Sequence, residues 1–170
     1  SGKKVGIIGL GNIGLRTAQL FAAFGAEVSY CNRSRKDESG FKYLPLEELL
    51  KESDIVSLHL PLNEETRGFM SRERLELMRE DAIFINCARG PIADEKALAE
   101  LLKEGRIGAA AADVYSEEPP LPEEHPLLTA PRTLLTPHIG FYTKEAMRRR
   151  AAIEFDNVLS YLRGEKKNLC

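Results

Sequence analysis

Short apolar runs alternate with segments of helical period along most of the chain. Strand-like apolar runs cover residues 3–10, 26–30, 55–60, 82–86, 107–113 and 133–136. Apolar residues recur at helical spacing over residues 12–24, 46–51, 72–79, 95–104 and 144–163. Strands that alternate with helices in this way predict a parallel sheet covered on both faces. The right-handed crossover rule then favours a doubly wound α/β sheet of the Rossmann dinucleotide-binding type.

One long segment, residues 114–132, interrupts the alternation. It has no hydrophobic period, and it contains Pro119, Pro120, Pro122, Pro126 and Pro131. A structureless loop of this length is usually either functional or disordered, and its neighbours along the chain favour function. His125 lies inside this loop, where we expect it to be solvated.

A glycine-rich motif, GLGNIG at residues 9–14, follows the first predicted strand and opens the first predicted helix. That context is the one in which G-x-G-x-x-G indicates dinucleotide binding. Gly9 allows a tight turn, Gly11 lets backbone amides approach a pyrophosphate, and Gly14 lets the helix pack closely on the strand. A glycine turn without a ligand is the plainer alternative. S-adenosylmethionine is a second candidate ligand, although nothing else in the chain supports it.

The end of the second predicted strand bears on the choice of dinucleotide. NAD-binding folds usually carry Asp or Glu about 20 residues past the glycines, where it binds the ribose hydroxyls. Here Asn32 stands 18 residues after Gly14 and is followed by Arg33, Ser34 and Arg35. Guanidinium and hydroxyl groups suit a 2′-phosphate, which a carboxylate would repel. We therefore expect NADP(H) to be preferred over NAD(H), a solvated charge run being the alternative.

Composition narrows the remaining classes. The 170 residues carry 24 basic and 26 acidic side chains, a formal net charge of −2, which argues against a nucleic-acid partner. No apolar run approaches the roughly 20 residues of a membrane span. The three cysteines are widely spaced and lack metal-ligand spacing, so we expect no metal site and a reduced, cytoplasmic setting.

Three ionisable residues fall at the ends of the late strands, the edge where an open parallel sheet binds its ligands. They are Arg89, Glu118 and His138. Each has a plain explanation by itself: a surface cation, a loop charge and a hydrogen-bonded histidine. Together, in a dinucleotide-binding fold, they offer an anion clamp, a partner carboxylate and an acid–base group.

With these residues in view, the sequence resembles the cofactor domain of the D-2-hydroxyacid dehydrogenase family. The matching stretches are HLPLNEET at 59–66, NCARGPIADEKAL at 86–98, AADVYSEEP at 111–119 and TPHIGFYT at 136–143, besides the glycine motif. The resemblance implies an oxidoreductase in which Arg89 binds the substrate carboxylate and carbonyl. It also implies that His138 is the acid–base and that Glu118 is its partner.

The resemblance extends the cofactor-binding set. It implies that Asp113 hydrogen-bonds to the nicotinamide carboxamide and that Cys87 and Ala88 lie beside the ring. It also implies that Leu60, Pro61 and Thr66 contact the adenosine half and the phosphates. His59 is expected to have a packing role. The full cofactor-binding set comprises Gly9, Gly11, Asn12, Ile13, Gly14, Asn32, Arg33, Ser34, Arg35, Leu60, Pro61, Thr66, Cys87, Ala88, Asp113 and Gly140.

The substrate stays open within small 2-keto and 2-hydroxy acids. Arg-Ser after the second strand resembles the glyoxylate and hydroxypyruvate reductases, whereas FYT at 141–143 resembles the D-lactate dehydrogenase branch. Corepressors of the C-terminal-binding-protein type keep the same three ionisable residues, so a nicotinamide-sensing binding protein is the alternative function.

The resemblance also implies a substrate domain, which we expect to be absent from this chain. We expect residues 3–163 to form the dinucleotide-binding domain and residues 164–170 to form a tail leading back to that absent domain. Without the opposing wall of the cleft, this domain should bind cofactor with little turnover. The resemblance further implies a homodimer.

Overall fold

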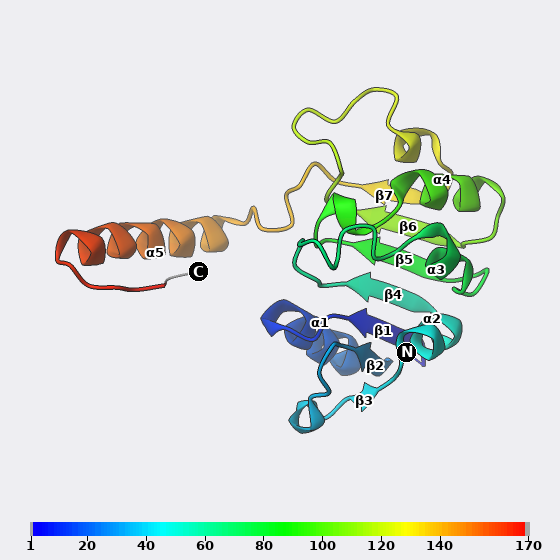
Figure 1. The fold of residues 1–170 in the computed structure, drawn as a ribbon, viewed down its shortest axis with the longest axis horizontal. Coiled ribbons are helices and arrows are strands. Elements are labelled where there is room, and N and C mark those ends of the chain that lie inside the picture. The colour runs from blue at the N-terminus through cyan, green and yellow to red at the C-terminus, as the bar shows by residue number, and fades with distance from the viewer. Residues whose placement is uncertain (1, 169–170) are drawn as a thin grey trace. The chain divides into compact units, whose positions relative to one another are not determined.

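The sheet contains seven strands, all parallel, in a computed structural model that describes residues 2–168. The strands are β1 (Lys4–Ile8), β2 (Glu27–Cys31), β3 (Lys42–Tyr43), β4 (Ile55–Leu58), β5 (Ile83–Asn86), β6 (Ala109–Ala112) and β7 (Thr133–Leu135). Their order is β3-β2-β1-β4-β5-β6-β7, as the ribbon shows (Figure 1). This order confirms the doubly wound sheet. Successive strands are added on one side of β1 up to β3 and on its other side from β4 onward, and such folds bind ligands at this switch point between β1 and β4.

The helices confirm the predicted alternation with small shifts in their bounds. They are α1 (Asn12–Ala23), α2 (Leu46–Glu52), α3 (Arg72–Glu76), α4 (Glu95–Lys103) and α5 (Lys144–Leu162), with 3-10 turns η1 (Asp37–Ser39), η2 (Gly90–Ile92) and η3 (Pro126–Thr129). No helix within residues 2–168 is long and apolar enough to cross a membrane.

Two elements differ from the prediction. Strand β3 has only two residues, too few for an alternating pattern to reveal it, and is formed by pairing with β2. Helix α3 ends at Glu76, whereas the apolar period predicts residues 72–79. The Arg106 guanidinium donates to the carbonyl oxygens of Glu76 and Met78, so these carbonyls bind a distant side chain at the point where the helix stops.

Apolar residues form two clusters, one for each face of the sheet. Because successive side chains of a strand point to opposite faces, Val5 and Ile7 belong to one cluster and Ile8 to the other. The smaller cluster includes Ala18 of α1, and the larger one gathers buried residues from α2, α3 and α4. Both faces are therefore packed around β1, which holds the glycine-rich turn rigidly.

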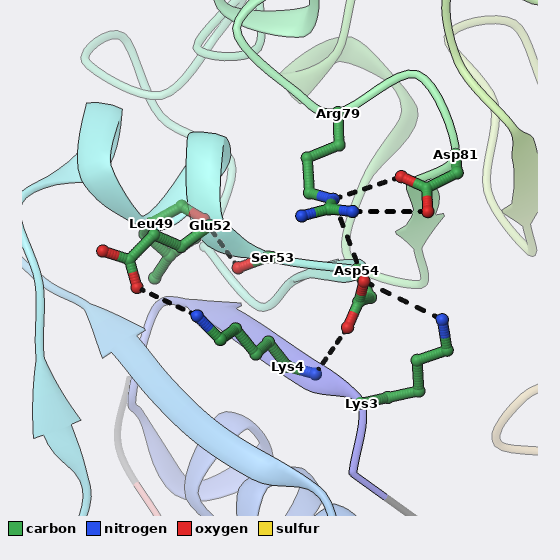
Figure 2. A network of polar contacts seen from close by, with 8 residues as sticks. All are labelled: Lys3, Lys4, Leu49, Glu52, Ser53, Asp54, Arg79 and Asp81. Atoms are coloured by element: carbon green, nitrogen blue, oxygen red, sulfur yellow. Dashed lines mark hydrogen bonds and ion pairs between the residues drawn. The ribbon is translucent and has the colours of Figure 1, made fainter.

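Charged side chains connect the segments at the amino-terminal ends of β1 and β4, the end of the sheet opposite the glycine motif (Figure 2). Asp54, just before β4, accepts a 2.8 Å hydrogen bond from the backbone N–H of Lys4. Its carboxylate also lies 3.8 Å from Lys3 Nζ and 3.8 Å from Arg79 Nε, and Arg79 in turn binds Asp81. The hydrogen bond to Arg79 lowers the pKa of the Asp81 carboxyl. These contacts tie β1 to β4 at the edge away from the glycine motif.

The chain divides into two compact units, with the boundary between Pro137 and His138. The first unit holds the whole sheet together with α1–α4. The second consists of residues from His138 onward and is dominated by α5, whose first turn is capped by the Thr143 hydroxyl accepting from Ala146 N–H at 3.1 Å.

Candidate functional site

The glycine turn after β1 is held by close backbone contacts. Gly9 has φ +95°, and its N–H donates to the Cys31 carbonyl at 2.9 Å. A Cβ at Gly9 would lie 2.7 Å from the His59 carbonyl oxygen, and one at Gly14 only 2.0 Å from the Gly9 carbonyl oxygen. Both glycines are thus required by the protein's own packing.

Gly11 is different, because a Cβ placed there meets nothing within 4 Å. It is the N-cap of α1, and no side chain caps that helix end. The first N–H groups of the helix have no partner within the helix and no side-chain cap, and they lie at the positive end of the helix dipole. This cradle fits a diphosphate, which would occupy the space that a side chain at position 11 would fill.

The Asn32 amide joins the end of β2 to the glycine turn. Its Oδ1 accepts from Leu10 N–H at 3.4 Å, and its Nδ2 donates to the Ser34 carbonyl at 3.0 Å. A neutral side chain with both ends engaged therefore stands where NAD-binding folds usually carry a carboxylate.

The cations that follow Asn32 lie in different settings. Arg33 is 86% exposed, and its Nη1 lies 3.2 Å from Glu65 Oε2. Arg35 lies over the Tyr43 ring, 5.9 Å from its centroid. Arg33 thus extends from the end of β2 to Glu65 in the loop after β4, whereas Arg35 contacts Tyr43 of β3.

That loop after β4 contains a tightly bonded turn. Thr66 Oγ1 donates to the Pro61 carbonyl at 2.6 Å and accepts from Asn63 N–H at 2.9 Å, while Thr66 N–H donates to Asn63 Oδ1 at 2.9 Å. Leu60 lies against the glycine turn, its Cδ2 3.0 Å from where a Gly9 Cβ would be. Leu60 therefore borders the glycine turn, and the hydrogen bonds of Thr66 hold the rest of the loop in a compact turn.

His59 begins the same loop and is half-buried. Its Nε2 lies 3.0 Å from Ser57 Oγ, and burial lowers its pKa, which favours the neutral imidazole. These contacts agree with the packing role expected from the sequence.

Arg89 is positioned by Asn86, a buried residue to which the sequence analysis assigned no role. Asn86 Nδ2 donates to the Arg89 carbonyl at 3.0 Å, and its Oδ1 accepts from Ala88 N–H at 3.0 Å. The Arg89 side chain is exposed, and its Nη1 donates to the Ala88 carbonyl at 2.6 Å. The sequence feature that could have revealed the role of Asn86 is its position as the polar last residue of an otherwise apolar strand, β5.

Asp113 and Cys87 end the two neighbouring strands β6 and β5. Asp113 is buried, and its Oδ1 accepts from Thr136 Oγ1 at 2.5 Å. The Cys87 side chain is partly accessible to solvent at the edge of the sheet. Partial burial raises the pKa of its thiol, and the negative charge of Asp113 raises that pKa further. The Cys87 side chain is therefore a neutral thiol near neutral pH.

His125 is buried, so the expectation that it is solvated is wrong. Its Nε2 lies 3.2 Å from Glu95 Oε2, and its Nδ1 accepts from Leu127 N–H at 3.4 Å. The Glu95 carboxylate also accepts from Ser116 N–H at 3.1 and 3.2 Å. The pair fastens the loop of residues 114–132 to the start of α4, and part of that loop forms the turn η3.

The segment that carries Arg89 also packs against the start of the segment that carries Glu118. A Cβ at Gly90 would lie 1.9 Å from the Tyr115 carbonyl carbon and 2.3 Å from Ser116 N. Burial raises the pKa of the Tyr115 hydroxyl, and the negative charges of Asp113 and Glu118 raise it further. The backbone after Arg89 is thus packed directly on the start of the loop that holds Glu118.

Removing one partner of the buried pair should destabilise the domain. His125→Ala leaves the buried Glu95 carboxylate with its Ser116 N–H contacts but without the imidazole, and the loss of a buried hydrogen-bond partner typically costs about 1–3 kcal/mol. Urea unfolding of the parent and the variant measures this difference in the free energy of unfolding. Glu124→Ala, an exposed neighbour, is the control, and an unchanged midpoint for His125→Ala would show that the pair contributes nothing.

His138 begins the second unit, half-buried and with φ +53°. Its ring packs edge-on against Phe141, the centroids 6.0 Å apart. The three ionisable residues are therefore divided between the units, with Arg89 and Glu118 in the first and His138 in the second. Gly140 also belongs to the second unit. Within residues 2–168 there is no group of three His, Cys, Asp or Glu side chains able to hold a metal ion.

Comparisons with known proteins agree with this geometry. Residues 1–140 match the family described as D-isomer specific 2-hydroxyacid dehydrogenase, NAD binding domain. The chain is 44% identical to the glyoxylate reductase of Aeropyrum pernix over 168 residues, which is 96% of this chain and 50% of that protein. It thus spans about half the length of the curated relatives it matches.

Two solved structures share the fold closely. The TT0316 protein from Thermus thermophilus is 42% identical, with a TM-score of 0.92, over 99% of this chain and 53% of that one. An acyclic imino acid reductase in complex with NADPH and D-arginine is 34% identical, with a TM-score of 0.91, over 99% of this chain and 53% of that one.

Proposed function

Since the chain belongs to the D-isomer specific 2-hydroxyacid dehydrogenase family and is its NAD-binding domain, we propose that it binds NADP(H) in preference to NAD(H). The observation that carries this preference is the end of β2. The position of the usual ribose-binding carboxylate holds Asn32, whose amide is bonded to Leu10 and Ser34, and the exposed guanidinium of Arg33 comes next. The related reductase in complex with NADPH supports the proposal.

We assign the residues that would hold the dinucleotide from the open cradle at Gly11 and from the resemblance to the family. Gly9, Gly11 and the first amides of α1, at Asn12 and Ile13, receive the diphosphate, while Gly14 keeps the helix close to β1. Arg33 and Ser34, with Arg35 beside them, receive the 2′-phosphate. Leu60, Pro61 and Thr66 border the adenosine half, and Cys87, Ala88, Asp113 and Gly140 border the nicotinamide.

In the complete enzyme we propose reduction of a small 2-keto acid, or oxidation of the matching 2-hydroxy acid. The bound nicotinamide supplies the hydride. Arg89 binds the substrate carboxylate with its planar fork and stabilises the negative charge that develops on the carbonyl oxygen. His138 donates a proton to that oxygen as the general acid, and Glu118 is the carboxylate partner of His138.

This domain by itself should bind cofactor with little turnover, because one wall of the cleft belongs to a separate substrate domain. The cofactor domains would form the contact of a homodimer. The named relatives are reductases and a dehydrogenase, so the corepressor alternative is not favoured.

Arg33→Ala tests the preference. Losing one charge-assisted contact to the 2′-phosphate at an exposed site should raise the Kd for NADPH about tenfold. The Kd for NADH, which lacks that phosphate, should change less than about twofold. Isothermal titration calorimetry with both dinucleotides gives the two ratios.

The matched control is Arg150→Ala, because Arg150 is also an exposed arginine paired with a single glutamate, Glu154. It should leave both constants unchanged. Equal affinity of the parent for NADPH and NADH, with no effect of Arg33→Ala, would refute the proposed preference.

A further inference from the structure

An ion pair connects the two loops that flank the glycine turn. Arg33 follows β2, Glu65 follows β4, and these strands are the two neighbours of β1 in the sheet. Arg33 Nη1 and Glu65 Oε2 lie 3.2 Å apart, with the side chains 86% and 73% exposed. The pair is therefore open to solvent and to any ligand that enters the cradle from the β2 side.

Both partners extend from backbone that other contacts hold in place. The side-chain amide of Asn32, the residue before Arg33, accepts a hydrogen bond from Leu10 N–H and donates one to the Ser34 carbonyl. On the other side, Glu65 lies within the turn that Thr66 closes with Pro61 and Asn63. The two charges thus face each other because of where their loops are fixed.

The position of this carboxylate matters for the proposed 2′-phosphate. Asn32 carries no negative charge that would repel that phosphate, yet Glu65, on another loop, places a carboxylate oxygen 3.2 Å from the Arg33 guanidinium. A 2′-phosphate that binds Arg33 must displace the Glu65 carboxylate or accept its repulsion. A ribose with a free 2′-hydroxyl carries no such charge and has no comparable conflict.

We propose that Glu65 is a specificity-determining residue, a counter-charge to Arg33 that weakens NADPH binding and so sets the ratio of NADPH to NADH affinity. The inference rests on the proposed function, because it assumes that Arg33 faces the 2′-phosphate. The residue acts through the charge of Arg33, and its effect is specific to ligands that bear the extra phosphate.

Glu65→Gln tests the inference in this chain, which contains the complete sheet and its core. Removing the negative charge should lower the Kd for NADPH about threefold to fivefold, a typical range for an exposed charge interaction, and leave that for NADH within about twofold. The fragments 2′,5′-ADP and 5′-ADP should repeat the contrast without the nicotinamide. Added salt should shrink the gain, because exposed charges are screened.

Two controls separate this effect from a general change in charge. Glu64→Gln removes the same charge one residue away, and Glu64 forms no ion pair in the described part of the chain, so NADPH affinity should stay near the parent value. In the Arg33→Ala background, Glu65→Gln should give a smaller gain, because the competition for the guanidinium is gone.

The outcomes distinguish this inference from the proposed function. If the parent prefers NADPH but Glu65→Gln matches Glu64→Gln, or tightens both dinucleotides equally, the role of Glu65 is overturned and the preference stands. If the parent shows no preference but Glu65→Gln creates one that needs Arg33, the role of Glu65 is supported and the preference proposed for the parent falls. If the parent shows no preference and neither the Arg33 nor the Glu65 variant changes the affinity for NADPH, both proposals are overturned.

Discussion

Gly11→Val should weaken dinucleotide binding by more than about 100-fold while the domain stays folded. A Cβ at this position meets no protein atom within 4 Å, and its φ of −78° is one that valine adopts readily. The valine side chain would instead fill the space over the first amides of α1, which the diphosphate needs. The cost to folding should be at most about 1 kcal/mol, the difference between glycine and an apolar residue at a helix N-cap.

Calorimetric titration with NADPH and urea unfolding of the same sample measure the two effects. Gly14→Ala provides the contrast, since its Cβ would lie 2.0 Å from the Gly9 carbonyl oxygen and should damage the fold itself. A Gly11→Val variant that binds NADPH within threefold of the parent would show that the diphosphate does not use this cradle.

His138→Ala should lower kcat by about 10²–10⁴-fold in an enzyme that joins this domain to a substrate domain, without changing the Kd for NADPH. The chain has three histidines, of which His59 is bonded to Ser57 and His125 is buried against Glu95. His138 follows β7 in the chain, and it is the histidine to which the family resemblance gives the acid–base role. Loss of a general acid removes stabilisation of the transition state and leaves cofactor binding intact.

Steady-state kinetics with glyoxylate, hydroxypyruvate and pyruvate, combined with a direct binding measurement, separate these two effects. Comparable losses in kcat and in NADPH affinity would instead indicate that His138 has a structural role.

The sequence predicted the doubly wound parallel sheet and the glycine turn because the strands, the helices and the turn each leave local signals along the chain. Apolar runs that end in glycine mark buried parallel strands, and the steric need for Gly9 and Gly14 is confirmed by the contacts of their missing side chains. Strand β3 escaped prediction because a two-residue strand has no period of its own.

The missed features depend on contacts between distant residues. His125 lies in a proline-rich segment without a pattern, and its burial comes from Glu95, which precedes it by 30 residues. Glu65 similarly reads as an ordinary loop charge until the fold brings it next to Arg33, 32 residues earlier. Sequence periodicity reports which face of an element is buried and gives no information on such pairs.

The most direct test is a crystal structure of this domain with NADPH. The account predicts the diphosphate against Gly11 and the first amides of α1, with the 2′-phosphate about 3 Å from donor atoms of Arg33 or Ser34. An adenosine bound elsewhere, or a 2′-phosphate in solvent with the Arg33 guanidinium turned away from it, would contradict the account.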